Sequence, residues 1–185
     1  MGHTETGASH TTDFLAIALK GYLQLGLVPD YDEAIVAVPI DYVSAGIVHL
    51  SLQPENAGKI FHYANPSPAH LREVYSWLRS FGYEIEVVPY TTLREHVLEV
   101  DPSHALYPVL PLYPPEERLR RELFEVTAFE QIDCRTTNKG LEGTGIECAA
   151  VAEELVHTVL SFFVDTGWLD PPQKQRAGVG AGAEA

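Results

Sequence analysis

The first regular pattern of apolar and polar positions runs from residue 13 to residue 25, where apolar side chains recur every three or four positions. This spacing predicts an amphipathic helix. Thr11 or Thr12 can cap its first turn through a hydroxyl group, and Gly26 can end it in a left-handed conformation. The preceding residues 1–9 are polar and include two glycines, which indicates a loop.

Segments typical of strands and helices then alternate as far as residue 100. Apolar or alternating runs at 35–40, 59–64 and 84–88 predict three short strands. Since each strand is followed by a helical pattern, this part of the chain is predicted to be an α/β layer over residues 1–100. The helices are expected to begin at Asp41, at Ser67-Pro68 and at a capping box of Thr92 and Glu95.

The pattern becomes mainly helical over residues 101–172. Five prolines break its first part into short pieces, a glycine-bearing loop spans 133–148, and an amphipathic helix is predicted over 151–166. The tail 173–185 is polar and rich in glycine and alanine, so we expect it to be disordered. Its glycine run at 178–182 is no phosphate-binding loop, because such a loop needs a strand before it and a helix after it.

Composition and charge narrow the class of protein. Apolar residues make up 45% and charged residues 21% of the 185 positions, which is globular composition. The formal net charge of -14 disfavours nucleic acid and anionic membrane surfaces as partners. No apolar run is long enough to cross a bilayer. Cys134 and Cys148 are too few for a disulfide scaffold or a zinc tetrahedron, which favours a reducing cytoplasm.

Common catalytic motifs are absent from the 185 residues. There is no nucleophile elbow, no phosphate-binding GxxxxGK[ST] loop and no HExxH pair. Short-chain reductases use Tyr-x-x-x-Lys, in which the lysine one helical turn away lowers the pKa of the tyrosine. None of the nine tyrosines is followed by lysine four positions later. The chain therefore lacks the proton donor of such a reductase.

Eight stretches in a fixed order nevertheless resemble one family. The stretches are Gly2–Gly7, Asp13–Leu15, Val38–Val43, Ile60–Pro66, Trp77-Leu78 through Phe81–Tyr83 to Val88–Tyr90, Ala105–Pro108, Gly140-Leu141 through Thr144 and Ile146 to Cys148, and Gly167–Leu169. Together they resemble the later part of the terminal thioester reductase domains of nonribosomal peptide and polyketide synthases, and the resemblance reaches Pro172. Carboxylic acid reductases and aminoadipate reductases carry a related domain.

The resemblance implies a partial extended short-chain dehydrogenase fold of class α/β: a few strands with flanking helices and a mainly helical substrate-binding subdomain. In the family, NADPH reduces an acyl thioester held on the phosphopantetheine arm of a carrier protein, and releases an aldehyde or an alcohol. The family's glycine fingerprint and catalytic residues match nothing in this chain, so no catalytic residue is assigned. NADPH is expected to bind only through the Rossmann half, in the same or a companion chain.

The resemblance also implies candidate binding residues. For Asp41 the alternative to a binding role is a role as a helix cap. For Phe14 and Phe61 the alternative is a place in the hydrophobic core. The cofactor-side candidates are Thr6 and Gly7, and the substrate-side candidates are Phe14, Asp41, Tyr42 and Phe61.

Two departures from the family leave local loop shape and carrier docking open. Thr136 stands where the family often has asparagine, and Ala149-Ala150 stand where a Pro-Pro pair is common. The leading hypothesis is a fragment, or one half of a split enzyme, that shapes the acyl pocket and docks the carrier protein. The alternatives are a non-catalytic carrier-binding module and a part of an aminoadipate or carboxylic acid reductase.

Overall fold

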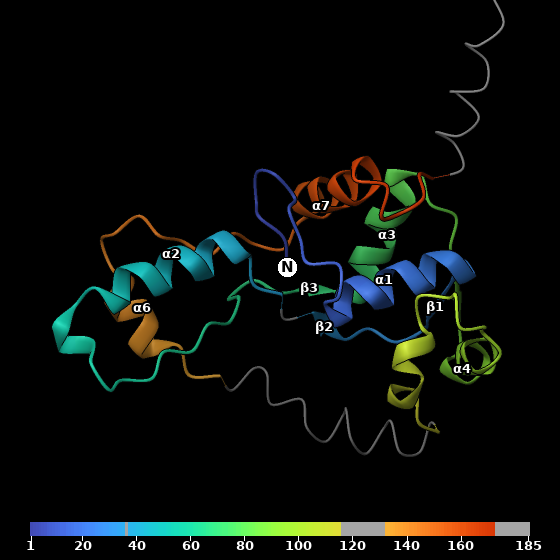
Figure 1. Ribbon diagram of the computed structural model, residues 1–185, viewed down its shortest axis with the longest axis horizontal. Helices are drawn as coiled ribbons and strands as arrows, with labels where there is room; N and C mark the ends of the chain where they lie inside the picture. The colour runs from blue at the N-terminus through green and yellow to red at the C-terminus, as the bar shows by residue number, and fades with distance from the viewer. Residues whose placement is uncertain (36, 116–131, 173–185) are drawn as a thin grey trace, which may run out of the picture.

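The computed structural model describes residues 1–35, 37–115 and 132–172, in which short strands are interspersed among helices (Figure 1). This agrees with the predicted α/β class. The helices are α1 (Phe14–Leu25), α2 (Ile40–Ser51), α3 (Leu71–Phe81), α4 (Tyr90–Leu98), α6 (Arg135–Leu141) and α7 (Glu153–Asp165), with 3-10 helices η1 (Pro54–Asn56) and η2 (Tyr107–Leu112). The strands are β1 (Leu27–Pro29), β2 (Ala34–Ile35), β3 (Ala69–His70) and β4 (Glu86–Val88).

The strands form two small sheets. β1 and β4 run parallel, with Leu27 opposite Glu86 and Pro29 opposite Val88. β2 and β3 run antiparallel, with Ile35 opposite Ala69. The parallel pair joins segments separated by α2 and α3, which is the crossover connection expected of an α/β fold.

Two of the predicted strands differ from the structure. Among the described residues of the run 35–40, only Ile35 belongs to β2, and Pro39, which has no backbone N–H to donate to a ladder, already precedes α2. The run 59–64 is not a strand. Its side chains Phe61 and Tyr63 instead pack against the hydrophobic cluster around α2 and α6. Burial of these rings replaces strand pairing.

The glycines that end α1 and α3 were predicted correctly, and the capping residues at the helix starts were not. Gly26 and Gly82 end α1 and α3 with φ of 69° and 117°, as expected for glycine in the left-handed region. The cap of α1 is Asp13, whose carboxylate accepts a hydrogen bond of 2.7 Å from the Leu15 N–H, so the prediction of Thr11 or Thr12 was wrong. A hydroxyl or a carboxylate can cap a helix, and here the carboxylate belongs to Asp13, the residue directly before the first turn of α1.

The predicted starts of the next helices were also wrong. Ala69–His70 pair as β3, so α3 begins after them rather than at Ser67-Pro68, and Glu73 accepts a 2.8 Å hydrogen bond from the His70 N–H. α4 begins at Tyr90, behind Pro89, so no capping box forms at Thr92. Strand pairing of Ala69–His70 delays the start of α3 beyond the expected position, and Pro89 places the start of α4 before the expected capping residue.

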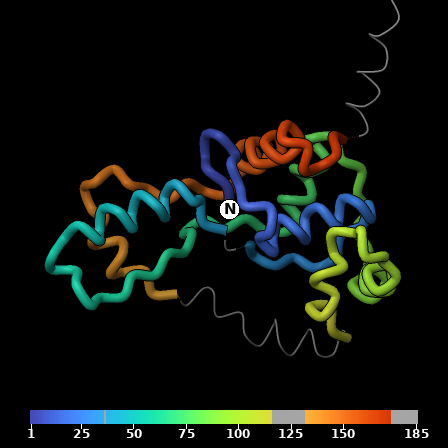
Figure 2. Tube along the Cα trace, viewed as in Figure 1, coloured from blue at the N-terminus to red at the C-terminus, as the bar shows by residue number. Residues whose placement is uncertain are grey.

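The described residues bury three hydrophobic clusters. The largest joins α1, α3 and α7, the second joins β4, α4 and η2, and the third lies between α2 and α6. Figure 2 shows the consequence: the α2–α6 part forms one end of an elongated molecule, and the other helices form the opposite end. The N-terminal loop lies between these parts, beside α7.

The division at residue 100 remains a prediction, although α7 shares its core with α1 and α3. The tail 173–185 lies outside the described residues. Among the helices that the structure describes, none is long and apolar enough to span a bilayer.

Candidate functional site

A groove of about 1200 Å³ separates the α2–α6 part from the β2–β3 sheet. Its walls come from residues that lie far apart in the sequence. One wall is formed by residues 32–34 and 64–70, and the other by Tyr42 of α2 with residues 132–135 and 138–148 around α6. A hollow of this size, built by several elements, is the main candidate for ligand binding among the described residues.

Asn65 lines the groove and holds three neighbouring segments of the chain together. Its side-chain Nδ2 donates to the carbonyl oxygens of Ala37 at 3.0 Å and Ala149 at 2.9 Å. Its Oδ1 accepts from the Ser67 N–H at 2.9 Å. Asn65 is only 6% exposed, so each of these bonds satisfies a group that water cannot reach easily. Sequence analysis missed this residue; its only signal was the Asn-Pro pair at the end of one resemblance stretch.

Tyr42 is the predicted substrate residue that reaches the groove. It is 8% exposed, and its ring meets that of Tyr63 edge to face, with centroids 5.6 Å apart. Burial, followed by the nearby thiol of Cys148, raises the pKa of Tyr42 above its ordinary value. The phenol therefore stays protonated at neutral pH, and can both donate and accept a hydrogen bond inside the groove.

Asp41 neither caps α2 nor lines the groove. Pro39 is the capping residue, and Asp41 lies in the first turn of the helix. Its carboxylate instead binds the N-terminal loop, accepting from the Thr4 hydroxyl at 2.5 Å and from the Thr4 N–H at 3.3 Å. Burial alone would raise the pKa of Asp41, but the hydrogen bonds, led by the one from the Thr4 side chain, outweigh it and lower the pKa. Its substrate role remains a prediction.

The Asp41–Thr4 contact should stabilise the chain only while the carboxylate is ionised. Since the folded-state pKa lies below the ordinary value, the contribution is complete above that value and is lost as pH falls through the folded pKa. We expect Asp41→Asn to lower the free energy of unfolding by about 1 kcal/mol at neutral pH and by much less near pH ~2. Urea unfolding at both pH values checks this. The exposed Asp165→Asn is the control, and an equal loss at both pH values would contradict the account.

The cofactor-side candidates Thr6 and Gly7 lie away from the groove, in the N-terminal loop. That loop is closed by hydrogen bonds from the His3 N–H to the Ala8 carbonyl (3.0 Å) and from the Gly7 N–H to the His3 carbonyl (2.9 Å). Gly7 is buried against α7 with φ of 70°, and Thr6 is exposed. Their cofactor role remains a prediction, while the geometry gives Gly7 a packing role.

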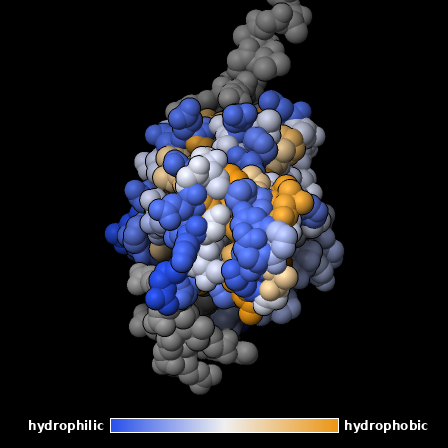
Figure 3. Space-filling view, turned by 90° about the vertical axis from the view of Figure 1, so that its left-hand side faces the viewer, coloured by the Kyte–Doolittle hydropathy of each residue, from blue (hydrophilic) through white to orange (hydrophobic). Residues whose placement is uncertain are grey.

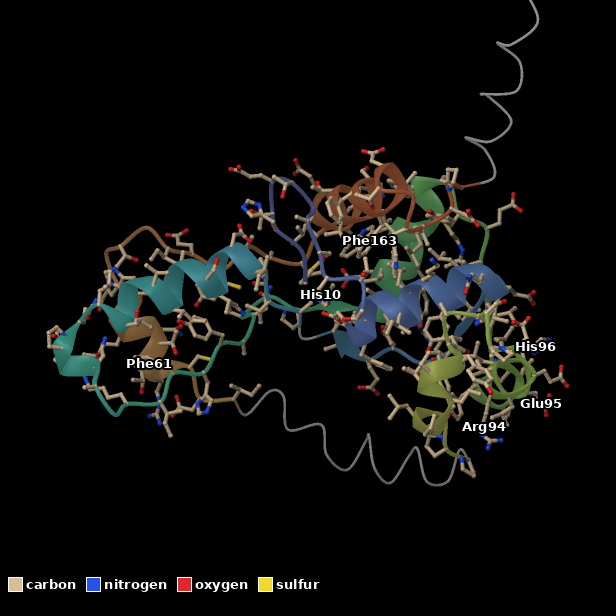
Figure 4. All side chains as sticks on the ribbon, viewed as in Figure 1. His10, Phe61, Arg94, Glu95, His96 and Phe163 are labelled. Carbon is tan, nitrogen blue, oxygen red and sulfur yellow. The ribbon has the colours of Figure 1, made fainter. Side chains whose placement is uncertain are left out.

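The two candidate phenylalanines have different surroundings. Phe14 is 48% exposed at the start of α1, so the alternative of a core residue is wrong for it. Phe61 is partly buried against the α2–α6 cluster, beside α6 in Figure 4, so the core alternative holds there. Neither lines the groove. Their substrate roles remain predictions.

The described residues offer neither a metal site nor a dinucleotide cradle. No group of three or more His, Cys, Asp or Glu side chains among them could hold a metal ion. Phosphate binding after a parallel strand needs backbone N–H groups at the start of the next helix. β1 leads into β2 and not into a helix, and only Pro89 separates β4 from α4. Neither described parallel strand is followed by the glycine-rich loop that a dinucleotide cradle needs.

Comparisons with known proteins give a consistent result. No family model matches the chain. The L-2-aminoadipate reductase of Saccharomyces cerevisiae is 30% identical over 181 residues, which cover 92% of this chain and 13% of that protein. The crystal structure of the terminal R domain from the myxalamid PKS-NRPS biosynthetic pathway superposes with a TM-score of 0.75 and 31% identity, over 94% of this chain and 43% of the other.

A second solved structure agrees in fold. It is the thiolation-reductase di-domain from an archaeal non-ribosomal peptide synthetase, which matches 91% of this chain with a TM-score of 0.69 and 20% identity. The chain spans about one eighth of the curated relative and less than half of the crystallised R domain. The fold predicted from the resemblance, a partial α/β fold of the extended short-chain dehydrogenase type, is confirmed.

Proposed function

Because this chain is homologous to the C-terminal part of terminal thioester reductase domains over nearly its whole length, we propose that it forms the acyl-binding part of such a reductase. The complete reductase would release a carrier-bound acyl or peptidyl thioester as an aldehyde or alcohol. The observation that carries the proposal is the match in sequence and fold over 94% of the chain.

The groove is the part of the chain best suited to hold the acyl group. Its volume of about 1200 Å³ exceeds that of a typical small-ligand pocket, and suits an extended chain linked to pantetheine. Thioester reduction requires the carbonyl carbon to be held near the nicotinamide, so a rigid acyl site contributes mainly by positioning. Asn65 and Tyr42 give the groove fixed walls.

The hydride would come from a separate nucleotide-binding half. The 185 residues contain no Tyr-x-x-x-Lys, and neither β1 nor β4 is followed by a glycine-rich loop that leads into a helix. A surface for that half is present on α2, whose outer face exposes Ile40, Ile47 and Val48 and continues into Leu52, which is 77% exposed. Figure 3 shows this end of the molecule, with apolar patches among hydrophilic side chains. An apolar face of this kind favours burial against another domain.

The thioester would be presented by a carrier protein. The archaeal neighbour joins a thiolation domain and a reductase domain in one chain, which supports a carrier as the partner of a reductase of this fold. The residues that would contact the carrier are those at the mouth of the groove. Thr136, one of the departures from the family, is exposed on α6, the helix that carries part of the groove lining.

A chimera tests the proposed function. The chain is fused to the nucleotide-binding half of the myxalamid-pathway R domain, and aldehyde formation from a hexanoyl thioester of a carrier protein is measured by trapping the product. We expect the chimera to form aldehyde at least about 100-fold faster than the nucleotide-binding half alone, since only the chimera positions the thioester. A chimera that folds and binds NADPH but forms no aldehyde above that background would overturn the proposal.

A further inference from the structure

A glycine of α2 leaves room for the ring of Tyr63. Gly46 is buried one helical turn after Tyr42, on the same face of α2. A Cβ atom at position 46 would lie 2.8 Å from the Tyr63 hydroxyl oxygen and 2.9 Å from Cε1 of the same ring. Any residue larger than glycine would therefore displace Tyr63. The absence of a side chain at position 46 is what lets this ring pack against α2.

The Tyr63 ring in turn supports Tyr42, the tyrosine that lines the groove. The two rings meet edge to face, with centroids 5.6 Å apart and an angle of 76° between their planes. Aromatic pairs in this geometry attract each other beyond the effect of ring burial. Tyr63 belongs to the hydrophobic cluster around α2 and α6 and does not itself line the groove. It therefore contacts the groove wall without reaching the groove.

The ring of Tyr63, and not its hydroxyl, holds this side chain in place. The hydroxyl oxygen is buried and makes no hydrogen bond to the residues that the structure describes. A buried hydroxyl without a partner costs free energy, so it contributes nothing to the placement of the side chain. Burial also raises the pKa of Tyr63, which keeps the phenol neutral. Packing against Gly46 and Tyr42 fixes the ring.

We propose that Tyr63 is a positioning residue of the acyl site. Admitted by Gly46, it fixes the Tyr42 ring in the groove wall and so sets how bulky an acyl group the groove accepts. This inference rests on the proposed function, in which the groove holds the acyl group. Without Tyr63, the Tyr42 ring can move back into the vacated space. A wall that yields in this way holds a slender chain less firmly and admits a bulkier one.

Two acyl groups of different width test the inference. The probes are hexanoyl pantetheine and 2-ethylhexanoyl pantetheine, and their binding to the full 185-residue chain is measured by calorimetry. Tyr63→Leu should weaken hexanoyl binding about fivefold, the effect of losing one aromatic pair. Binding of the branched probe should stay unchanged or become tighter. An equal loss for both probes, no loss for either, or no binding of either probe to the parent chain would overturn the inference.

Further variants assign the effect to the ring of Tyr63. Tyr63→Phe should bind both probes as the parent does, because the hydroxyl has no partner. Gly46→Ala should weaken hexanoyl binding as Tyr63→Leu does, since the added Cβ displaces the ring. Once the ring is absent, adding Gly46→Ala to Tyr63→Leu should cause no further loss. Additive losses, or weaker hexanoyl binding by Tyr63→Phe, would contradict the positioning role.

Gly21→Ala is the matched control for Gly46→Ala. Gly21 is also a buried glycine inside a helix, α1, and a Cβ atom there would lie 2.2 Å from Cγ of Leu106. Neither residue lines the groove. The control should therefore disturb packing but leave the affinity of both probes unchanged. Weaker hexanoyl binding by Gly21→Ala, equal to that of Gly46→Ala, would show that a general loss of packing controls the groove. Thermal unfolding shows that each variant is folded.

The chimera separates this inference from the proposed function. In the chimera, Tyr63→Leu should raise KM for the hexanoyl thioester and leave KM for the 2-ethylhexanoyl thioester unchanged. If the chimera is active and the substitution changes neither KM, the proposed function stands and the positioning role does not. If the parent chimera reduces neither thioester, the proposed function itself fails.

Discussion

Gly7→Ala is expected to lower the free energy of unfolding by about 3 kcal/mol and to release the N-terminal loop from α7. A Cβ atom at this position would lie 2.2 Å from the Thr158 carbonyl oxygen and 2.9 Å from the Phe162 Cβ. The first of these is a backbone atom of a helix, so it cannot rotate away. The φ of 70° adds about 1 kcal/mol for any residue with a Cβ.

Gly143→Ala is the control that separates these two effects. Gly143 has a φ of 74°, and a Cβ there would meet nothing within 4 Å. It should therefore lose only the contribution of the left-handed backbone, about 1 kcal/mol. Denaturant unfolding of both variants measures the difference. Equal losses would show that Gly7 is not packed against α7 as described.

Asn65→Ala is expected to have an effect of similar size, about 3 kcal/mol. The substitution removes three hydrogen bonds and leaves the carbonyl groups of Ala37 and Ala149 without their side-chain donor. Because Asn65 itself lines the groove and ties down the segments around Ala37 and Ala149, we also expect thioester binding to weaken. Denaturant unfolding and calorimetry with hexanoyl pantetheine check the two effects.

The matched control for this variant is Asn138→Ala. Asn138 is exposed on α6 and lines the same groove, but its side chain makes no hydrogen bond to the described residues. Its loss of stability should stay within about 0.5 kcal/mol. If the two asparagine variants lost the same stability, the bracing role of Asn65 would be refuted.

Local sequence signals predicted the elements that depend on local physics. Helical spacing gave α1 within one residue of its start, and Gly26 marked its end correctly. The alternation at 84–88 contains β4, and the long amphipathic run at 151–166 contains α7. In each of these, the periodic burial of side chains and the glycine stop act over a few neighbouring residues.

The failures came where distant contacts decide. Residues 59–64 were predicted as a strand, but Phe61 and Tyr63 pack against the hydrophobic cluster of α2 and α6 instead of joining a sheet edge. The partners of Asn65 lie 28 and 84 positions away, so no window of sequence displays them. The residues that line the groove likewise come from distant segments, one near residue 32 and another near residue 145.

The candidate site could be predicted only in part. The resemblance indicated Tyr42, which the structure places in the groove, but it also indicated Thr6, Phe14 and Phe61, which do not line the groove. Family likeness marks stretches of chain, and tertiary packing decides which side chain of a stretch faces the ligand. Asp41 shows this most clearly, because its neighbour faces the groove while its own carboxylate binds Thr4.

The central claim is that this chain supplies the acyl side of a reductase and relies on another part for the hydride. It is tested most directly by the rate of NADPH oxidation, followed by absorbance, with a carrier-bound hexanoyl thioester. Three samples are compared: the chain alone, the nucleotide-binding half alone and the chimera. We predict oxidation coupled to thioester loss by the chimera and none above background by the chain alone. Sustained, thioester-dependent NADPH oxidation by the chain alone would contradict the account.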